Sequence, residues 1–475
     1  MWKFKKRPSL NAQMRKEKDE KFRQGRRNLI KYSLFTGALL GLPRWKIFET
    51  LELAGGQALA QTAACLPTNR SLHLAAGQGG FAWFQLLWPH NDVAAANNDR
   101  FAFHAQGQSV LAQGTDRPLT FAPQTPFQDL PASRQISAFM AGNNETHTRS
   151  PTSSATIGGN SIYAIAASLQ SSNPTVIPAI TIGQNAPYGD APGAPQNSRV
   201  GDPDSVVELF NSAASRAGGL LENASDASLY AAHYTALTSL NRASNRPTTR
   251  GSYGASQTAA DLLGTNLASI LAVTDEDLSR YGVNRGTRRV ELDIAKTLII
   301  GVKAFQLGLT SSITLEALGD DPHGAFNNMN SLTNTVTNLG AMLDGFMGDL
   351  RATPDDSCSG STLADNFVMT IAGDTPKNPL NRNGWPDGTP GGSNWMYVLG
   401  AGHIKTGWHG GIDRDGNVQG FNPATGQNTD NLNRGDTAEA TNAAVAYAIA
   451  KGDTRRVDEF ARGINIDGIV NPVLM

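Results

Sequence analysis

The chain has few cysteines, a short N-terminal apolar run and almost no net charge. Two cysteines among 475 residues exclude a small domain held together by a disulfide framework. The uncharged run at residues 32–43 is twelve residues long, shorter than the about 20 residues that a membrane-spanning helix needs. A hydrophobic content of 40% excludes a wholly disordered chain. The length suits two or three domains, or one large α/β domain with elaborate loops.

The net charge of −1 conceals an uneven distribution. Residues 1–31 carry twelve basic and three acidic side chains, whereas the rest of the chain carries 28 basic and 38 acidic ones. A basic head on an acidic body indicates that the head has a role of its own. We expect no nucleic-acid partner for the acidic body, because proteins that bind nucleic acid neutralise phosphates with basic side chains.

The basic head contains the sequence RRNLIK, which begins with Arg26 and Arg27 and is followed by the apolar run. This pattern resembles a twin-arginine export signal, whose Arg pair is read by the export receptor. We therefore interpret residues 1–64 as a basic signal segment. The resemblance implies that the export machinery is a partner and that the protein is periplasmic or extracellular. The alternative is a basic arm that binds nucleic acid or a membrane surface.

The two cysteines, Cys65 and Cys358, are far apart in the sequence, and Cys65 lies at the start of the expected mature chain. Three arrangements are open. A disulfide between them is permitted in an oxidising compartment and ranks first. A lipid on Cys65, which would anchor the protein to a membrane, ranks second, and two unpaired thiols are the third alternative.

Residues 65–475 are expected to form one large domain. No period of 20–50 residues repeats, which disfavours solenoids and propellers. Residues 205–289 show apolar residues at three- and four-residue spacing and predict a mainly helical insertion or cover. Long Gly- and Asn-rich loops separate short apolar segments that predict strands. These segments are residues 71–76, 175–183, 313–318, 367–372 and 395–400.

The clearest local unit joins the strands at residues 313–318 and 367–372 through an amphipathic helix. The apolar stripe of this helix consists of Leu332, Val336, Leu339, Leu343, Phe346 and Leu350. A strand–helix–strand unit normally has parallel strands, and ligands of such sheets bind at the carboxyl ends of the strands. The loops that begin at Gly319, Gly373 and Gly400 are therefore expected to share one rim.

The order of these segments resembles a known group of proteins. Residues 307–324, the stripe helix, residues 367–388 and residues 392–413 follow an export signal. The same order occurs in a twin-arginine-exported bacterial family of unknown function, which has the sulfatase-like fold of the alkaline phosphatase superfamily. The resemblance is best over residues 290–415. It implies an α/β fold with a mainly parallel central sheet and helices on both faces.

The family's first motif falls on residues 319–323 of this chain, and it places Asp321 and His323 where metal ligands are expected. A carboxylate and an imidazole two residues apart on a loop suit zinc or a related divalent ion. Asp374 and His403 lie on the same expected rim and are weaker candidates for metal ligands.

Other polar residues are weaker candidates for chemistry. Thr148 and Ser150 lie in a polar loop before an expected helix at residues 161–169, where either could serve as a nucleophile. The eight histidines are otherwise scattered, and apart from the candidates His323 and His403 a structural role is expected more often than metal binding.

The chain also departs from the family at expected metal ligands. An apolar residue at positions 371–372 stands in place of a Glu, and Ser393 and Asn394 stand in place of an Asp-His pair. The glycine turn at residues 77–80 lacks the family's following Asp. Apolar and amide side chains cannot balance the charge of two cations about 3.5–4 Å apart. A full two-metal centre is therefore not expected.

Two functions follow from this reading. The first, which the ligand replacements favour, is a non-catalytic binding or envelope-assembly component with a degenerate metal site and an envelope protein as its partner. The alternative is a metal-dependent hydrolase of phosphate or sulfate esters that uses Asp321 and His323. The alternative expects one divalent metal, which is zinc, calcium or manganese, whereas the first function needs no cofactor.

Overall fold

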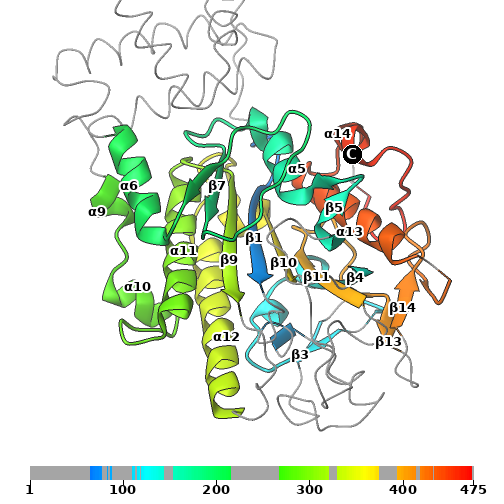
Figure 1. Cartoon of the computed structure of the whole chain (residues 1–475), viewed down its shortest axis with the longest axis horizontal. Helices are drawn as coiled ribbons and strands as arrows, with labels where there is room; N and C mark the ends of the chain where they lie inside the picture. Colours follow the sequence, from blue (N-terminus) through cyan, green and yellow to red (C-terminus); the bar gives the residue numbers. More distant parts are fainter. Residues whose placement is uncertain are drawn as a thin grey trace, which may run out of the picture.

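The protein is represented by a computed structural model (Figure 1). The structure describes residues 65–77, 83, 86–87, 110–112, 115–117, 119–143, 153–214, 267–319, 329–373, 393–412, 418–431 and 433–472. The predicted α/β class is confirmed, because helices flank a mostly parallel sheet of eight strands.

The strands of the central sheet lie in the order β12-β4-β11-β10-β1-β9-β7-β8. All run in the same direction except β11, which pairs antiparallel with both of its neighbours. Their bounds are β1 Arg70–Gly77, β4 Ser137–Asn143, β7 Ala179–Ile182, β8 Ser198–Val200, β9 Ser312–Gly319, β10 Phe367–Gly373, β11 Ser393–Leu399 and β12 Gly407–His409.

Short strands form three small additional sheets. They are β2 Val110–Leu111 with β3 Thr120–Phe121, β5 Thr156–Ile157 with β6 Asn160–Ser161, and β13 Gly411–Ile412 with β14 Val418–Phe421 and β15 Asn428–Thr429.

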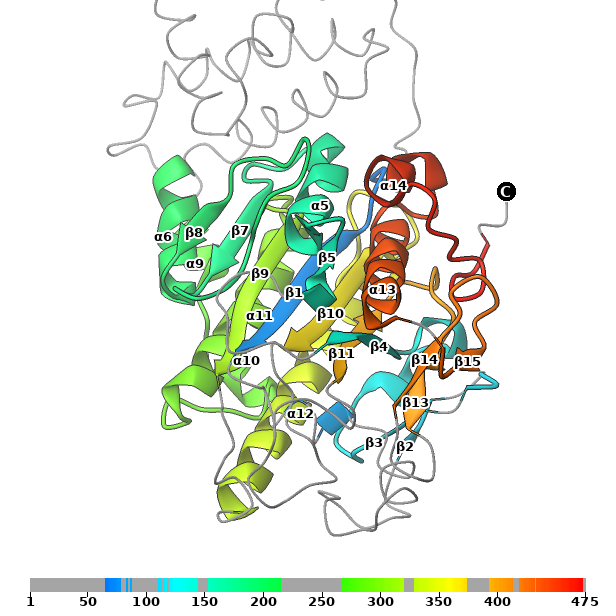
Figure 2. The ribbon, with the colours of Figure 1, turned by 45° about the vertical axis from the view of Figure 1, so that its right-hand side comes forward.

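The helices pack on both faces of the central sheet (Figure 2). One face is covered mainly by α11 Arg289–Gln306 and α12 Met329–Ala352, beside α6 Pro203–Ala214, α9 Leu267–Leu271 and α10 Asp275–Arg280. The other face carries α5 Ile162–Leu169, α13 Arg434–Ile449 and α14 Thr454–Ala461. Of these, α6, α9 and α10 fall in or at the start of the stretch that was predicted to be a helical insertion.

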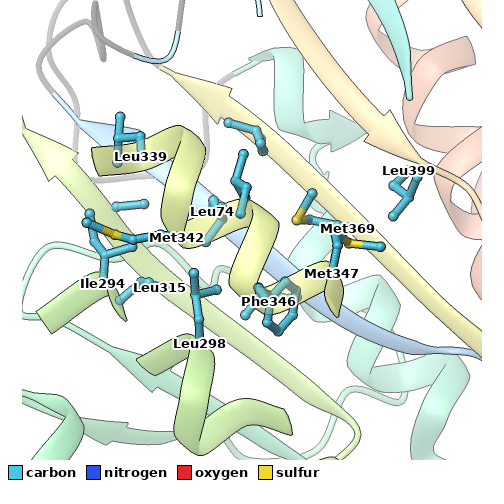
Figure 3. Close-up of a cluster of buried hydrophobic side chains, with 14 of the residues drawn as sticks. Leu74, Ile294, Leu298, Leu315, Leu339, Met342, Phe346, Met347, Met369 and Leu399 are labelled. Atoms are coloured by element: carbon cyan, nitrogen blue, oxygen red, sulfur yellow. The ribbon is translucent and has the colours of Figure 1, made fainter. Parts of the chain in front are cut away.

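The predicted stripe of α12 belongs to the hydrophobic core on this face of the sheet, and Figure 3 shows part of that core around Leu339 and Phe346. All six of its apolar residues are buried. The ring of Phe346 lies 5.5 Å from that of Phe367 on β10, which also contacts Phe305 of α11 at 5.9 Å. The three- and four-residue spacing of the stripe therefore places one face of α12 against β10 and β1.

Alternation along β1 and β10 gives the two faces different chemistry. Leu72 and Leu74 of β1 point into the core under α11 and α12, whereas His73 lies between them on the opposite face. His73 is fully buried there, with Nδ1 2.8 Å from the Thr370 hydroxyl and Nε2 3.1 Å from the Ser71 hydroxyl. Both ring nitrogens have a partner, so His73 is a structural residue, as expected of a histidine outside the motif.

Truncation of Phe346 tests whether the stripe holds the fold together. Phe346→Ala is expected to lower the free energy of unfolding by about 3–5 kcal/mol, because the cavity cannot close under a packed sheet. Thr337→Ala is the matched control, since Thr337 is exposed on the same helix and should change the value by less than about 0.5 kcal/mol. Urea unfolding followed by circular dichroism measures both. Equal effects would show that α12 does not depend on its stripe.

Candidate functional site

The carboxyl ends of several central strands meet along one edge of the sheet, which we call the carboxyl rim. The register pairs Gly77 at the end of β1 with Gly319 of β9, and Ala76 with Gly373 of β10. The antiparallel β11 begins on the same edge, where Ser393 pairs with Asn143 at the end of β4. The loops that leave Gly319 and Gly373 therefore start from the two neighbours of β1, as predicted.

The prediction for the third loop, at Gly400, is wrong. Because β11 runs antiparallel to β10, its carboxyl end at Leu399 pairs with Met369 near the start of β10. Gly400 thus lies on the opposite edge, and the start of β11 lies on the carboxyl rim. His403 follows Gly400, and its backbone N–H donates to the Gly400 carbonyl, so it does not belong to the rim either.

The surroundings of His403 also argue against metal binding. Its ring packs edge-on against Tyr447, with ring centres 6.2 Å apart. Burial, with the nearby positive charges of Lys451 and Arg134, lowers the pKa of His403 to about 4. Cations around an imidazole repel a further cation, which disfavours this candidate ligand.

A cluster of polar side chains joins the elements of the rim. We call Ser154, Ser393, Asn394, Arg434 and Asn442 the rim cluster. The buried amide of Asn394 donates to the Gly373 carbonyl at 2.9 Å and to the Ser154 hydroxyl at 3.1 Å. Asn442 of α13 donates to the backbone carbonyl of Ser154 at 2.8 Å. These bonds tie β10, β11, α13 and the turn at residues 153–155 together.

The cluster carries positive rather than negative charge. The Nε of Arg434 donates to the Ser393 hydroxyl at 3.0 Å. Arg434 is the first residue of α13, whose N-cap Asn433 accepts a hydrogen bond from the Gly435 N–H. The amino end of a helix has a partial positive charge, so it adds to the field of the guanidinium and disfavours a cation here.

The end of β9 has unusual backbone geometry. Leu318 is buried but has a φ of 72°, and the register between β1 and β9 shifts between Ala75 and Gly77. The left-handed region costs a bulky residue about 1–2 kcal/mol and is kept where the surroundings impose it, which is common beside functional sites. Asp321 follows this bend by three residues.

Most of the predicted site residues lie outside the described residues. They are Arg26, Arg27, Thr148, Ser150, Asp321, His323 and Asp374. The described part of the chain does contain a disulfide between Cys65 and Cys358, the first-ranked arrangement. Because this bond uses the Sγ of Cys65, the same sulfur cannot carry a lipid, which speaks against the predicted alternative of an anchor.

Two general findings concern only the described ranges. No group of three or more His, Cys, Asp or Glu side chains in them gathers where it could hold a metal ion. No helix among them is long and apolar enough to cross a membrane.

The replacements at Ser393 and Asn394 are visible in the sequence, but the partners of these two side chains are not. A local signal for Arg434 existed, because Asn433 is a favourable N-cap residue before the alanine-rich segment 438–450. Ser154 and Asn442 had no comparable signal, since their roles come from contacts between distant segments.

Three histidines are expected to stay uncharged well below neutral pH. Burial lowers the pKa of His73 and His409 to about 3, and that of His403 to about 4, from 6.5. The unfolded chain therefore binds more protons below pH 6.5 than the folded protein does. Stability should fall by about 1.4 kcal/mol per pH unit for each histidine as the pH drops from 6.5 toward 4. NMR titration of the ring signals in buffer and in urea gives the pKa values of the folded and unfolded states, from which this pH dependence follows. Ring signals that titrate near 6.5 in the folded protein would contradict the prediction.

Comparisons with known proteins place few constraints on this rim. No family model matches the chain, and no curated protein matches it. Among solved structures, the chain is similar to the carrageenan sulfatase Ps i-CgsB in complex with κ-ι-κ-neocarrahexaose. The likeness has a TM-score of 0.29 and 12% identity, and covers 80% of this chain and 72% of that chain. At this score it carries no argument about function, and the α/β class rests on the sheet itself.

Proposed function

We propose that this is an exported protein of sulfatase-like α/β architecture that serves as a non-catalytic binding or assembly component of the bacterial envelope. Its partner in this role is another envelope protein, and its rim acts without a two-metal centre. The architecture is proposed from the order of the sequence motifs and from the parallel strands whose ends form the rim.

The observation that carries this proposal is that the neutral side chains of Ser393 and Asn394 are already hydrogen-bonded within the protein. In the family that the sequence resembles, an Asp-His pair stands here and would bind metal. In this chain the Asn394 amide is engaged by Gly373 and Ser154, and Ser393 accepts from the Arg434 cation. Neutral groups already hydrogen-bonded within the protein, next to a guanidinium, do not fit a divalent cation. The donor set on this side of the rim is thus structural.

Metal analysis tests the absence of a catalytic centre. We expect the purified protein to hold far less than one zinc, calcium or manganese ion per chain. We also expect no hydrolysis of p-nitrophenyl phosphate or sulfate when each metal is added, because the neutral Ser393 and Asn394 stand where a two-metal site needs charged ligands. Elemental analysis and a colorimetric assay measure these. Stoichiometric metal that is lost in the double variant Asp321→Asn/His323→Ala would contradict the proposal.

That contrary result would favour the second candidate function, a metal-dependent hydrolase of phosphate or sulfate esters. One observation supports it. The strand that leads to Asp321 and His323 ends on the carboxyl rim, beside β1, in the strained bend at Leu318. A single metal held by Asp321 and His323 would need further ligands from elsewhere on the rim.

The location outside the cytoplasm is supported by the disulfide as well as by the basic head. A disulfide between Cys65 and Cys358 suits an oxidising compartment, since cytosolic thiols are kept reduced. Cys65 directly follows the small residues Ala63 and Ala64, so removal of residues 1–64 would leave the bonded cysteine at the new N-terminus.

Conservative substitution of the Arg pair tests the export route. The double variant Arg26→Lys/Arg27→Lys keeps the charge but should hold the precursor in the cytoplasm, because the receptor reads the guanidinium pair. The control is Arg15→Lys/Arg23→Lys, which makes the same change elsewhere in the basic head and should be exported normally. Cell fractionation and N-terminal sequencing of the product measure the outcome. Equal export of both variants would rule out a twin-arginine signal.

A further inference from the structure

The edge of the sheet opposite the rim contains a junction that holds the disulfide. We call Cys65, Arg70, Asp355, Cys358 and Asn366 the amino-edge junction. The bond joins cysteines 293 residues apart, with Cα atoms separated by 4.2 Å. Cys65 lies five residues before β1, and Cys358 lies in the turn that connects α12 to β10.

The turn that carries Cys358 is closed by its own hydrogen bonds. The backbone N–H of Asp355 donates to the Ser361 carbonyl at 2.9 Å, and that of Leu363 donates to the Thr353 carbonyl at 3.0 Å. The N–H of Cys358 donates to the Asp355 carbonyl at 2.8 Å, and the Cys358 carbonyl accepts from the Ser361 hydroxyl at 2.6 Å. The position of Cys358 within the turn therefore does not require the disulfide.

Asp355 fixes this turn to the start of β1. The Arg70 guanidinium donates to both carboxylate oxygens, at 2.9 and 3.1 Å, and the side chains of both residues are almost fully buried. Asn366 donates to the same carboxylate at 2.9 Å, and the Ser357 N–H donates at 3.0 Å. Burial alone would raise the pKa of Asp355, but the bonds from Arg70 and Ser357 outweigh it and lower the pKa. The carboxylate is thus ionised and bidentate, which is the most directional form of this pair.

The segment that carries Cys65 is also held in place independently. The Asn69 side chain donates to the Ala448 carbonyl at 2.7 Å, and its backbone N–H donates to the Ile449 carbonyl at 2.8 Å. Thr68 donates to Asn173 at 2.8 Å. Only two residues lie between Thr68 and Cys65, so the hydrogen bonds of Thr68 and Asn69 restrict where Cys65 can lie relative to Cys358.

Cys65 and Cys358 differ in their exposure to solvent. Cys65 is exposed, whereas Cys358 is 9% exposed. This difference favours the approach of an external disulfide to Cys65 over its approach to Cys358. Access to the sulfur is one of the factors that set the rate of thiol–disulfide exchange.

We propose that the chain folds with both thiols reduced, and that an external disulfide donor then oxidises the folded protein in a fixed order. The Cys65 thiolate attacks the donor, whose first thiolate leaves, and a mixed disulfide forms at Cys65. The Cys358 thiolate attacks the Cys65 sulfur, and the second donor thiolate leaves. The two cysteines lose two electrons and two protons, and the donor is reduced to two thiols. Cys65 is therefore the modification site, and Cys358 is the resolving thiol.

Single-cysteine variants of the full chain test the order, with oxidised glutathione as the donor. Cys358→Ser should gain one glutathione at Cys65 at least about ten times faster than Cys65→Ser gains one at Cys358. Mass spectrometry after acid quenching measures both rates, and circular dichroism checks the fold. Equal rates, or faster modification of Cys358, would overturn the proposal.

Wild-type protein reduced under native conditions provides the test that needs no variant. It should keep its circular dichroism spectrum and its resistance to protease. Early quenching after addition of oxidised glutathione should trap the adduct on the Cys65 peptide. Loss of the native spectrum on reduction, or an adduct mainly on Cys358, would refute folding before oxidation or the proposed order.

The closing step is tested at Asp355. Asp355→Asn removes the bidentate carboxylate and should lengthen the lifetime of the mixed disulfide by about tenfold, while leaving its rate of formation unchanged. Asp356→Asn is the matched control, because Asp356 is the adjacent and exposed aspartate. Equal closure rates in the two variants would show that the Arg70–Asp355 pair does not position the resolving thiol.

Discussion

The backbone hydrogen bonds of β1 are the interaction on which the rest of the structure depends. This strand pairs with β9 along one side and with β10 along the other. Without it, the part of the sheet made of β9, β7 and β8 shares no strand pairing with the part made of β10, β11, β4 and β12. Parallel strands in the middle of a sheet must be covered on both faces. β1 meets this need with leucines under α11 and α12 and with a fully paired histidine under α5.

Strand direction then decides which loops meet. Since β11 alone in the central sheet runs against its neighbours, it places Ser393 and Asn394 on the carboxyl rim and removes Gly400 from it. Ser393 and Asn394 therefore lie where their side chains hydrogen-bond to Arg434, Gly373 and Ser154 and hold the elements of the rim together. An amide that links the end of β10 to the turn at residues 153–155 gives the rim a fixed shape. A rim of fixed shape is what the proposed role in binding a partner surface requires.

The parts of this molecule that were predictable are those encoded by local periodicity. The stripe of α12 and the short apolar segments of β1, β9 and β10 follow from side-chain spacing alone. The direction of β11 does not, because side chains alternate between the faces in the same way whichever way a strand runs. Helix α13 also escaped prediction. Twelve of its 16 residues are buried, so it lacks the broad polar face that makes an apolar stripe visible in a sequence. The partners of Asn394 are distant in sequence, and only the folded chain brings them together.

The central position of β1 also affects when, during synthesis, the sheet can be completed. Arg70 at its start pairs with Phe367, so a ribosome must add about 300 more residues before that partner exists. At about 5–20 residues per second this takes about 15–60 seconds. For about 240 of those residues β9 is missing as well, because Ser71 pairs with Ser312. Both sides of β1 therefore lack a native partner at first, and later only the side that faces β10 does. Until then β1 presents unpaired N–H and C=O groups, which are a template for pairing with another chain.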